Sequence, residues 1–303
     1  MTDATKGTAQ TVCERDVTFL LAGDPPAYQL PTRNHWEDTS GQSMFARSVQ
    51  LRCFREIVAN NRFGLDAGAA QAAGDWIAGE LPSHWDVASG LYQSLLPPID
   101  RHGNPPAQYD PSIDPIMACL YGGGIPYTDP QLLATAALVH DQWTDATKTP
   151  YRINADDEGR GLGPLIGRYV EDGYDGDSLT DSAGHPWAVC TCNFAELSFA
   201  LANEINAGKP VPTDAKAATF LSQVGISDPA ATSAADAADA LRTAGDRMLN
   251  AVLFHSDHLS LSEQFDATTG YEKSVSDLTW SYAAYLSAAR VRAGQHHYPQ
   301  LTQ

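Results

Sequence analysis

The chain has 303 residues, of which 37 are acidic and 19 are lysine or arginine, so its formal net charge is −18. This charge argues against a nucleic acid partner, because a polyanion is bound through lysine and arginine. It argues equally against an anionic membrane surface. No apolar run is long enough for a transmembrane helix, and residues 1–7 lack the apolar stretch of a signal peptide. A neutral ligand is compatible with this composition.

Helical periodicity dominates the sequence, and strand-like alternation is rarely sustained. Apolar residues recur at helical spacing, and typical helix stop signals follow, over residues 43–61, 66–80, 112–121, 129–143, 186–206, 232–254 and 276–293. A shorter helix is predicted over 214–224. We find no linker or low-complexity run. The sequence therefore predicts an all-α scaffold that forms a single domain over residues 1–303.

Long polar loops separate several of these helices. They span residues 97–111, 154–184 and 255–269. Loops of this length are uncommon in compact domains and usually carry function. The five cysteines form an odd, scattered set that is a poor disulfide framework, and no histidine cluster completes a zinc site. We therefore expect buried, reduced thiols, and we expect the chemistry to lie in the loops.

The first candidate site comes just before the helix predicted from residue 43. Trp36 is followed there by Glu37 and Asp38. A carboxyl group against an indole ring in a partly dry pocket is harder to ionise than one in water, which suits a general acid. In the structural alternative, Asp38 or Ser40 caps the helix and Glu37 is solvated.

The second candidate is Glu263, the one charged residue in the stretch 259–265. It lies between two predicted helices and beside an aromatic residue. A general base that activates water needs a carboxylate in a protected pocket, with a polar neighbour that orients it. The alternative is that this segment is only a turn capped by Ser262.

The third candidate combines residues 167–174 with residues 184–187. Arg168 and Asp172 can form directional hydrogen bonds to hydroxyl groups, while Tyr169 and Trp187 supply flat apolar faces. Sites for sugars combine apolar faces with a few well-placed polar groups. A solvated acidic loop is the alternative interpretation.

Four motifs, in family order, resemble the catalytic domain of the glucoamylase family of glycoside hydrolases, which also contains glucodextranases. Residues 36–38, Trp-Glu-Asp, resemble the Trp-Glu-Glu that carries the general acid. Residues 167–172, Gly-Arg-Tyr-Val-Glu-Asp, are similar to its Gly-Arg-Tyr-Pro-Glu-Asp substrate loop. Residues 184–191 resemble its Gly-Asn-Pro-Trp…Cys-Thr helix start. Residues 261–266, Leu-Ser-Glu-Gln-Phe-Asp, followed by Asp-Leu-Thr-Trp-Ser-Tyr, resemble the general-base segment.

The resemblance implies an (α/α)6 barrel, in which twelve helices form two concentric rings, and inverting release of glucose from the non-reducing ends of α-1,4-glucans. It implies that Glu37 is the general acid and that Glu263 is the general base, which takes a proton from the attacking water. Such carboxyl groups stand about 6.5–9.5 Å apart. It implies no metal or organic cofactor. The implied sugar-binding residues are Trp36, Asp38, Arg168, Tyr169, Asp172 and Trp187.

Only 36 residues precede Glu37, where the family places about five helices. We therefore expect an incomplete double ring, about helices 6 to 12, which a partner chain could complete. Two alternatives to the glucan hydrolase stay open. One is a non-catalytic remnant that binds α-glucan or assembles with another chain, and the other is a trehalase-like or isomaltose-type hydrolase on the same scaffold.

Overall fold

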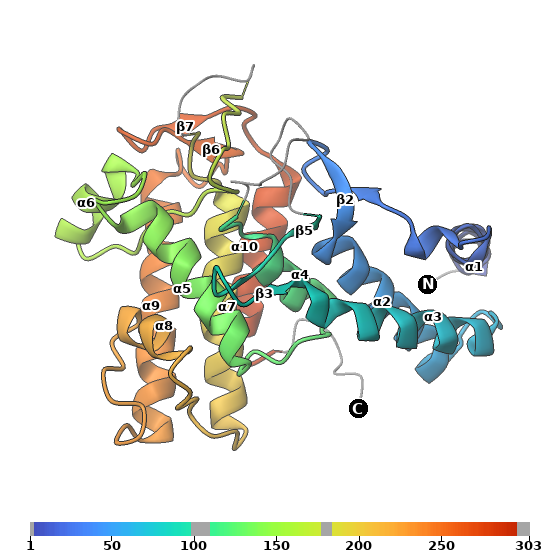
Figure 1. The fold of residues 1–303 in the computed structure, drawn as a ribbon. Helices are drawn as coiled ribbons and strands as arrows, with labels where there is room; N and C mark the ends of the chain where they lie inside the picture. Colours follow the sequence, from blue (N-terminus) through green and yellow to red (C-terminus); the bar gives the residue numbers. More distant parts are fainter. Residues whose placement is uncertain (1–2, 98–109, 177–183, 296–303) are drawn as a thin grey trace.

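The computed structural model describes residues 3–97, 110–176 and 184–295 of the chain. The structure is mostly helical, as the sequence predicts (Figure 1). The helices in the described residues are α1 (Asp3–Leu21), α2 (Met44–Asn60), α3 (Ala67–Glu80), α4 (Asp114–Gly122), α5 (Pro130–Thr144), α6 (Arg152–Gly159), α7 (Ala188–Asn206), α8 (Ala218–Gln223), α9 (Ala234–His255) and α10 (Thr279–Arg292).

All eight predicted helices are present, and their ends lie within four residues of those expected. Local capping explains much of this agreement. Four helices begin directly after a side chain that accepts a hydrogen bond from a backbone N–H of the first turn, which satisfies groups that have no partner inside the helix. These capping residues are Ser43, Asp66, Asp129 and Ser233.

Two helices were not predicted. Helix α1 contains several threonines and a glycine, has no clear apolar face and is mostly exposed. Helix α6 falls partly within the loop predicted over 154–184, where its acidic composition hid the periodicity. Residues 98–109 and 177–183, which belong to two of the predicted loops, lie outside the described residues.

Short antiparallel strands form within the loops between the helices. Strand β2 (Ser40–Ser43) pairs with β1 (Thr32–Arg33) on one side and with β5 (Leu95–Leu96) on the other. Two further pairs are separate hairpins: β3 (Trp85–Asp86) with β4 (Leu91–Tyr92), and β6 (Gln264–Phe265) with β7 (Glu272–Lys273). Strands β2, β6 and β7 lie at the same end of the molecule, the upper end in Figure 1.

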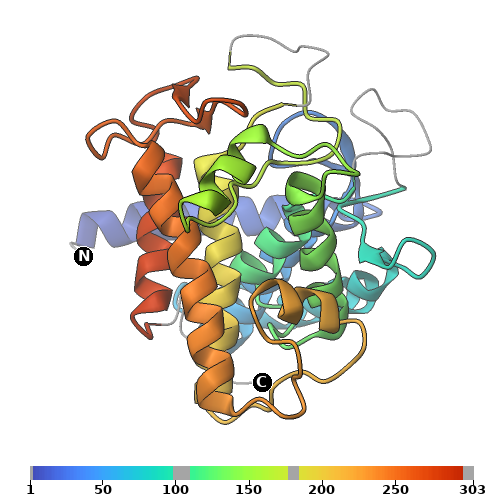
Figure 2. The same ribbon diagram turned by 90° about the vertical axis from the view of Figure 1, so that its left-hand side faces the viewer.

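Helix α7 lies at the centre of the fold and is buried along almost its whole length. Most of its residues are apolar or small on every side, which is typical of a helix without a solvent face. Helices α9 and α10 pack on it (Figure 2), and α4 connects it to the layer formed by α2 and α3. The first turn of α7 starts directly after Trp187, so this buried helix anchors one of the candidate residues.

Arg47 on α2 is a buried cation, 5% exposed, which is unusual for an arginine. Its Nη1 donates to His84 Nε2 at 3.1 Å, and its guanidinium stands 5.7 Å from the centre of the Trp76 ring. Arginine can only donate, so His84 Nε2 must be an acceptor. His84 Nδ1–H then donates to the Gln93 carbonyl oxygen at 2.7 Å. His84 is therefore held in the neutral form.

Burial lowers the pKa of His84 to about 4, and the Arg47 charge contributes in the same direction. The unfolded chain binds a proton on this ring below its ordinary pKa of 6.5, whereas the folded protein does not. We expect full stabilisation above pH 6.5 and a loss as the pH falls toward 4, worth up to about 3 kcal/mol from this group.

Urea unfolding at several pH values between 7 and 4 measures this pH dependence. The His84→Gln variant separates the contribution of His84 from the contributions of the other titrating groups. The variant should show a smaller decrease in the free energy of unfolding on acidification. Parallel pH curves for the two proteins would contradict the prediction.

Candidate functional site

Backbone hydrogen bonds bring three of the candidate segments together at one end of α7. The Trp187 N–H donates to the Ile166 carbonyl oxygen at 2.9 Å, and the Ala188 N–H donates to the Glu263 carbonyl oxygen at 3.1 Å. Trp187 also forms an isolated antiparallel bridge with Gln264. The loop with Arg168, the start of α7 and the segment with Glu263 are therefore fixed relative to one another by the main chain.

Asn34 organises the turn that carries Glu37 and Asp38. Its carbonyl oxygen accepts from the Glu37 N–H at 3.1 Å, and its Oδ1 accepts from the Asp38 N–H at 3.0 Å. Helix α2 is capped by Ser43, so neither Asp38 nor Ser40 has the capping role considered above. The turn is thus built independently of the helix that follows it.

The surroundings of Glu37 differ from the expectation. Its backbone is left-handed, with φ at 61°, and its side chain is exposed rather than enclosed beside Trp36. The physical reason is the tight turn on Asn34, which leaves Glu37 at the surface while Trp36 is buried. Its carboxylate is therefore accessible from solvent.

The Arg168 side chain, 4% exposed, is enclosed by aromatic rings. Its guanidinium carbon stands 4.6–5.4 Å from four ring centres, which allows cation–π attraction with each of them. Two of these rings come from its own loop, one from the turn with Glu37 and one from the start of α7. They belong to Tyr169, Tyr174, Trp36 and Trp187, and we call this group the aromatic cage.

Asp172 neutralises this buried cation. Arg168 Nε and Nη2 donate to the two carboxylate oxygens of Asp172 at 2.8 and 2.7 Å, and Asp172 is fully buried. Burial by itself lowers the pKa of Arg168, but the hydrogen bonds and charge of Asp172 outweigh it and raise the pKa overall. Arg168 therefore stays charged in a fixed orientation.

Asp38 joins the Glu37 turn to the aromatic cage. Its Oδ2 lies 3.4 Å from Arg168 Nη1 and accepts a hydrogen bond from the Tyr169 hydroxyl. Burial raises the pKa of Asp38 above its ordinary value, and the Arg168 charge offsets only part of this shift. Burial also raises the pKa of Tyr169, so its hydroxyl keeps the proton that it donates.

Glu263 is half-buried directly before strand β6, and its carboxylate has an orienting partner. Its Oε2 accepts from the hydroxyl of Ser274, and its N–H donates to the Val275 carbonyl oxygen at 2.8 Å. Ser262 does not cap a turn here, because its hydroxyl donates to the Gln264 carbonyl oxygen at 2.7 Å. The structure thus supplies the polar neighbour that a general base needs.

Three residues near the site were not predicted from the sequence. Ser274 follows strand β7 with φ at 66° and carries no local signal of its role. The Trp280 ring lies 5.4 Å from that of Trp36, although the motif that contains Trp280 assigned it no role. Tyr174 stands in one of the candidate loops and was not expected to be a site residue, although its ring contacts Arg168.

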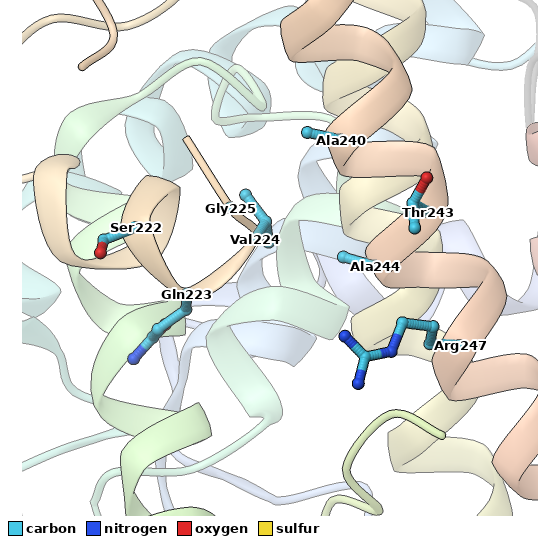
Figure 3. Close-up of a pocket in the computed structure, with 8 residues that line it drawn as sticks. All are labelled: Ser222, Gln223, Val224, Gly225, Ala240, Thr243, Ala244 and Arg247. Atoms are coloured by element: carbon cyan, nitrogen blue, oxygen red, sulfur yellow. The ribbon is translucent and has the colours of Figure 1, made fainter. Parts of the chain in front are cut away.

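A surface cavity of about 390 Å³ lies elsewhere, between α8 and α9 (Figure 3). Its lining is mostly small, with one cation, Arg247, which already donates to the carbonyl oxygens of Gly161 and Leu162. No carboxylate lines it. It therefore offers no acid–base pair, and the candidate site remains the one around the aromatic cage.

The described residues contain no group of three or more His, Cys, Asp or Glu that could hold a metal ion. None of the helices described is long and apolar enough to cross a membrane. All five cysteines are free. Cys119, Cys190 and Cys192 are buried as expected, whereas Cys13 and Cys53 are only half-buried.

Comparison with known proteins gives consistent matches. The chain is 27% identical over 300 residues to a glucoamylase of Blastobotrys adeninivorans, which covers 92% of this chain and 46% of that protein. It is 30% identical over 258 residues to a probable glucoamylase of Schizosaccharomyces pombe, with coverages of 84% and 52%. The chain thus spans about half the length of these curated relatives.

The fold matches as well. A glycoside hydrolase family 15 glucoamylase from Hypocrea jecorina superimposes with a TM-score of 0.76 at 21% identity, over 96% of this chain and 47% of that one. The helices therefore have the arrangement found in glucoamylases, which are (α/α)6 barrels, as the motifs implied. Because the family described as Glycosyl hydrolases family 15 also matches residues 25–290, this chain belongs to that family.

Proposed function

We propose that the chain carries the acid–base pair and sugar-binding residues of an exo-acting, inverting glycoside hydrolase. Its substrate is an α-1,4-glucan, such as starch or maltooligosaccharides, from which it releases glucose at the non-reducing end. The relatives described as glucoamylases support this substrate class. The neutral sugar also agrees with a chain charge of −18.

One observation carries the proposal: the two segments that carry Glu37 and Glu263 both adjoin the aromatic cage. Glu37 follows Trp36, whose ring lies 5.5 Å from that of Trp187. Glu263 is hydrogen-bonded through its backbone to Ala188, the residue after Trp187. A sugar bound against the cage would thus have a carboxylate from each of two separate loops beside it.

In the proposed reaction, Glu37 gives its proton to the glycosidic oxygen as the bond to C1 breaks. Glu263 takes a proton from the water that attacks C1 on the opposite face. The Ser274 hydroxyl holds the Glu263 carboxylate in place for this step. Asp172 fixes Arg168, and Arg168 Nη1 with Asp38 forms the polar side of the sugar site.

Glu263→Gln should abolish glucose release while sugar binding is nearly retained. The amide has the shape of the carboxyl group but cannot accept the proton, so we expect kcat to fall by about 10²–10⁴-fold. Glu158→Gln, the same change on the exposed side of α6, is the matched control and should keep full activity. A Glu263 variant with more than about a tenth of the activity would exclude Glu263 as the base.

The assay with maltose, isomaltose and trehalose as separate substrates decides the linkage. Preference for maltose supports the proposal, whereas preference for trehalose or isomaltose would place the chain with one of the other hydrolases considered above. Sugar binding without turnover in any of the three would favour the non-catalytic alternative.

The proposal includes a further polypeptide that completes the ring, either as a longer form of the chain or as a partner. It is supported by the exposed apolar side chains of Val58 on α2 and Leu286 on α10, 39% and 61% exposed. Light scattering of the purified chain with parallel activity assays tests this part. A monomer with a cooperative melt and full turnover would contradict it.

A further inference from the structure

Asp114 is a buried carboxylate to which the proposed reaction gives no role. It is the first residue of α4 and is fully buried. Its Oδ1 accepts from Trp36 Nε1–H at 2.7 Å and from the Ser112 hydroxyl at 2.8 Å. The bond to Trp36 joins segments 78 residues apart in the sequence, so it is a tertiary contact rather than a local cap.

Trp36 is the ring on which several parts of the site meet. The Arg168 guanidinium carbon stands 5.1 Å from it, and the Trp187 and Trp280 rings lie at 5.5 and 5.4 Å. Stacking contacts by themselves allow an indole to rotate in its plane or to tilt. The hydrogen bond from Nε1 is directional, and with a charged acceptor it is about twice as strong as a neutral one.

The cost of burying Asp114 argues for a role beyond helix stability. Its Oδ2 is buried without a hydrogen-bond partner among the described residues, and a buried carboxylate with an unsatisfied oxygen is unfavourable. His35 Nε2 is 3.8 Å from Oδ1, but burial lowers the pKa of this ring and keeps it neutral. The helix N-terminus offsets only part of the cost.

We infer that Asp114 is a positioning residue that fixes the Trp36 indole and, through it, the turn that carries Glu37. Glu37 follows Trp36 directly and has a left-handed backbone. A shift of the indole is therefore transmitted to the carboxylate at the next position. The consequence for catalysis rests on the proposed function, whereas the bond and its effect on Trp36 do not.

The first test is the NMR resonance of the Trp36 indole N–H in protein labelled with 15N-tryptophan, assigned by its loss in Trp36→Phe. Asp114→Ala should move the resonance upfield and speed its exchange with water. Asp114→Asn should move it partway, because an amide oxygen accepts more weakly than a carboxylate. The Asn variant also decides the question if the Ala variant does not fold.

Asp129→Ala is the matched control. Asp129 caps α5 through bonds to the Gln131 and Leu132 N–H groups, far along the chain from Trp36. Removing this helix cap should lower the stability of the protein and leave the Trp36 resonance unchanged. An unchanged resonance in both Asp114 variants, or an equal shift in Asp129→Ala, would overturn the inference.

The second test is kinetic. Asp114→Ala should lower kcat for maltose by about 10–100-fold with a smaller change in KM, because misplacing Glu37 affects the transition state most. Asp114→Asn should restore most of the loss. A loss of stability with unchanged kcat would mean that Asp114 serves only the fold. If the unmutated protein releases no glucose even with the polypeptide that completes the ring, the proposed function fails, and the indole resonance alone decides the inference.

Discussion

Asp172→Ala is expected to lower the free energy of unfolding by about 3–5 kcal/mol, because it leaves the buried Arg168 charge without its partner. Arg168 is 4% exposed and Asp172 is fully buried, so water cannot take over the role of the carboxylate. The cation would have only the cage rings and Asp38, 3.4 Å from Nη1. Urea unfolding at pH 7 measures the loss.

A second Arg–Asp pair provides the control. Arg292 binds Asp246 through Nε and Nη2, both at 2.8 Å, but these side chains are 50% and 35% exposed. Asp246→Ala should cost at most about 1 kcal/mol, because water solvates the charge that remains. Equal losses in the two variants would contradict the view that burial makes the Arg168–Asp172 pair important.

Adding Arg168→Met to Asp172→Ala should recover much of the lost stability. The double variant removes the uncompensated charge and leaves an apolar side chain among the cage rings. It should not recover sugar binding, since the polar side of the site is then gone. This separates the structural contribution of the pair from its contribution to the proposed site.

Gly122→Ala is expected to destabilise the fold by about 3 kcal/mol, the upper end of the usual cost of overpacking. Gly122 ends α4 where this helix touches α2. A Cβ atom there would lie 2.6 and 2.7 Å from the backbone carbon and oxygen of Ser48. Backbone atoms inside a helix cannot rotate away, so α2 and α4 would have to separate.

Gly79→Ala is the matched control for this prediction. Gly79 lies in α3, and a Cβ atom there would meet nothing within 4 Å. Alanine should therefore stabilise the protein by about 0.5–1 kcal/mol through its better helix propensity. Thermal melting of the two variants and of the unmutated chain tests both predictions, a lower melting temperature for Gly122→Ala and a higher one for Gly79→Ala. A neutral Gly122→Ala would show that the two helices can move apart without cost.

The sequence was sufficient for features that depend on neighbouring residues. The helices α5 and α9 could be predicted because Asp129 and Ser233 cap them and an apolar stripe follows. Helix α1 could not, because it has no clear apolar face to reveal its period. The burial of Arg47 also depends on His84, which comes from another segment, and no periodicity shows such a partner.

The distinction between features set by neighbouring residues and features set by distant ones also applies to the candidate site. Glu37, Glu263 and Arg168 stand in motifs of adjacent residues, and the resemblance singles them out as candidates without any structure. Ser274 and Asp114 each act on a residue far along the chain, 11 and 78 positions away, so their role appears only when the chain is folded. The exposure of Glu37 is an exception among local features: it results from the turn built by Asn34, three residues earlier, and the motif does not show this turn.

Because α7 is buried, the cysteines on this helix can report when the core of the protein opens. Cys190 and Cys192 lie on this helix and are fully buried, and burial raises the pKa of both thiols. A thiol-specific reagent needs an exposed thiolate, so it can reach them only when the core opens. Cys13 and Cys53 are half-buried and lie on α1 and α2. Labelling rates followed by peptide mass spectrometry would therefore distinguish local loosening at α1 and α2 from unfolding of the whole domain, in one sample and without denaturant.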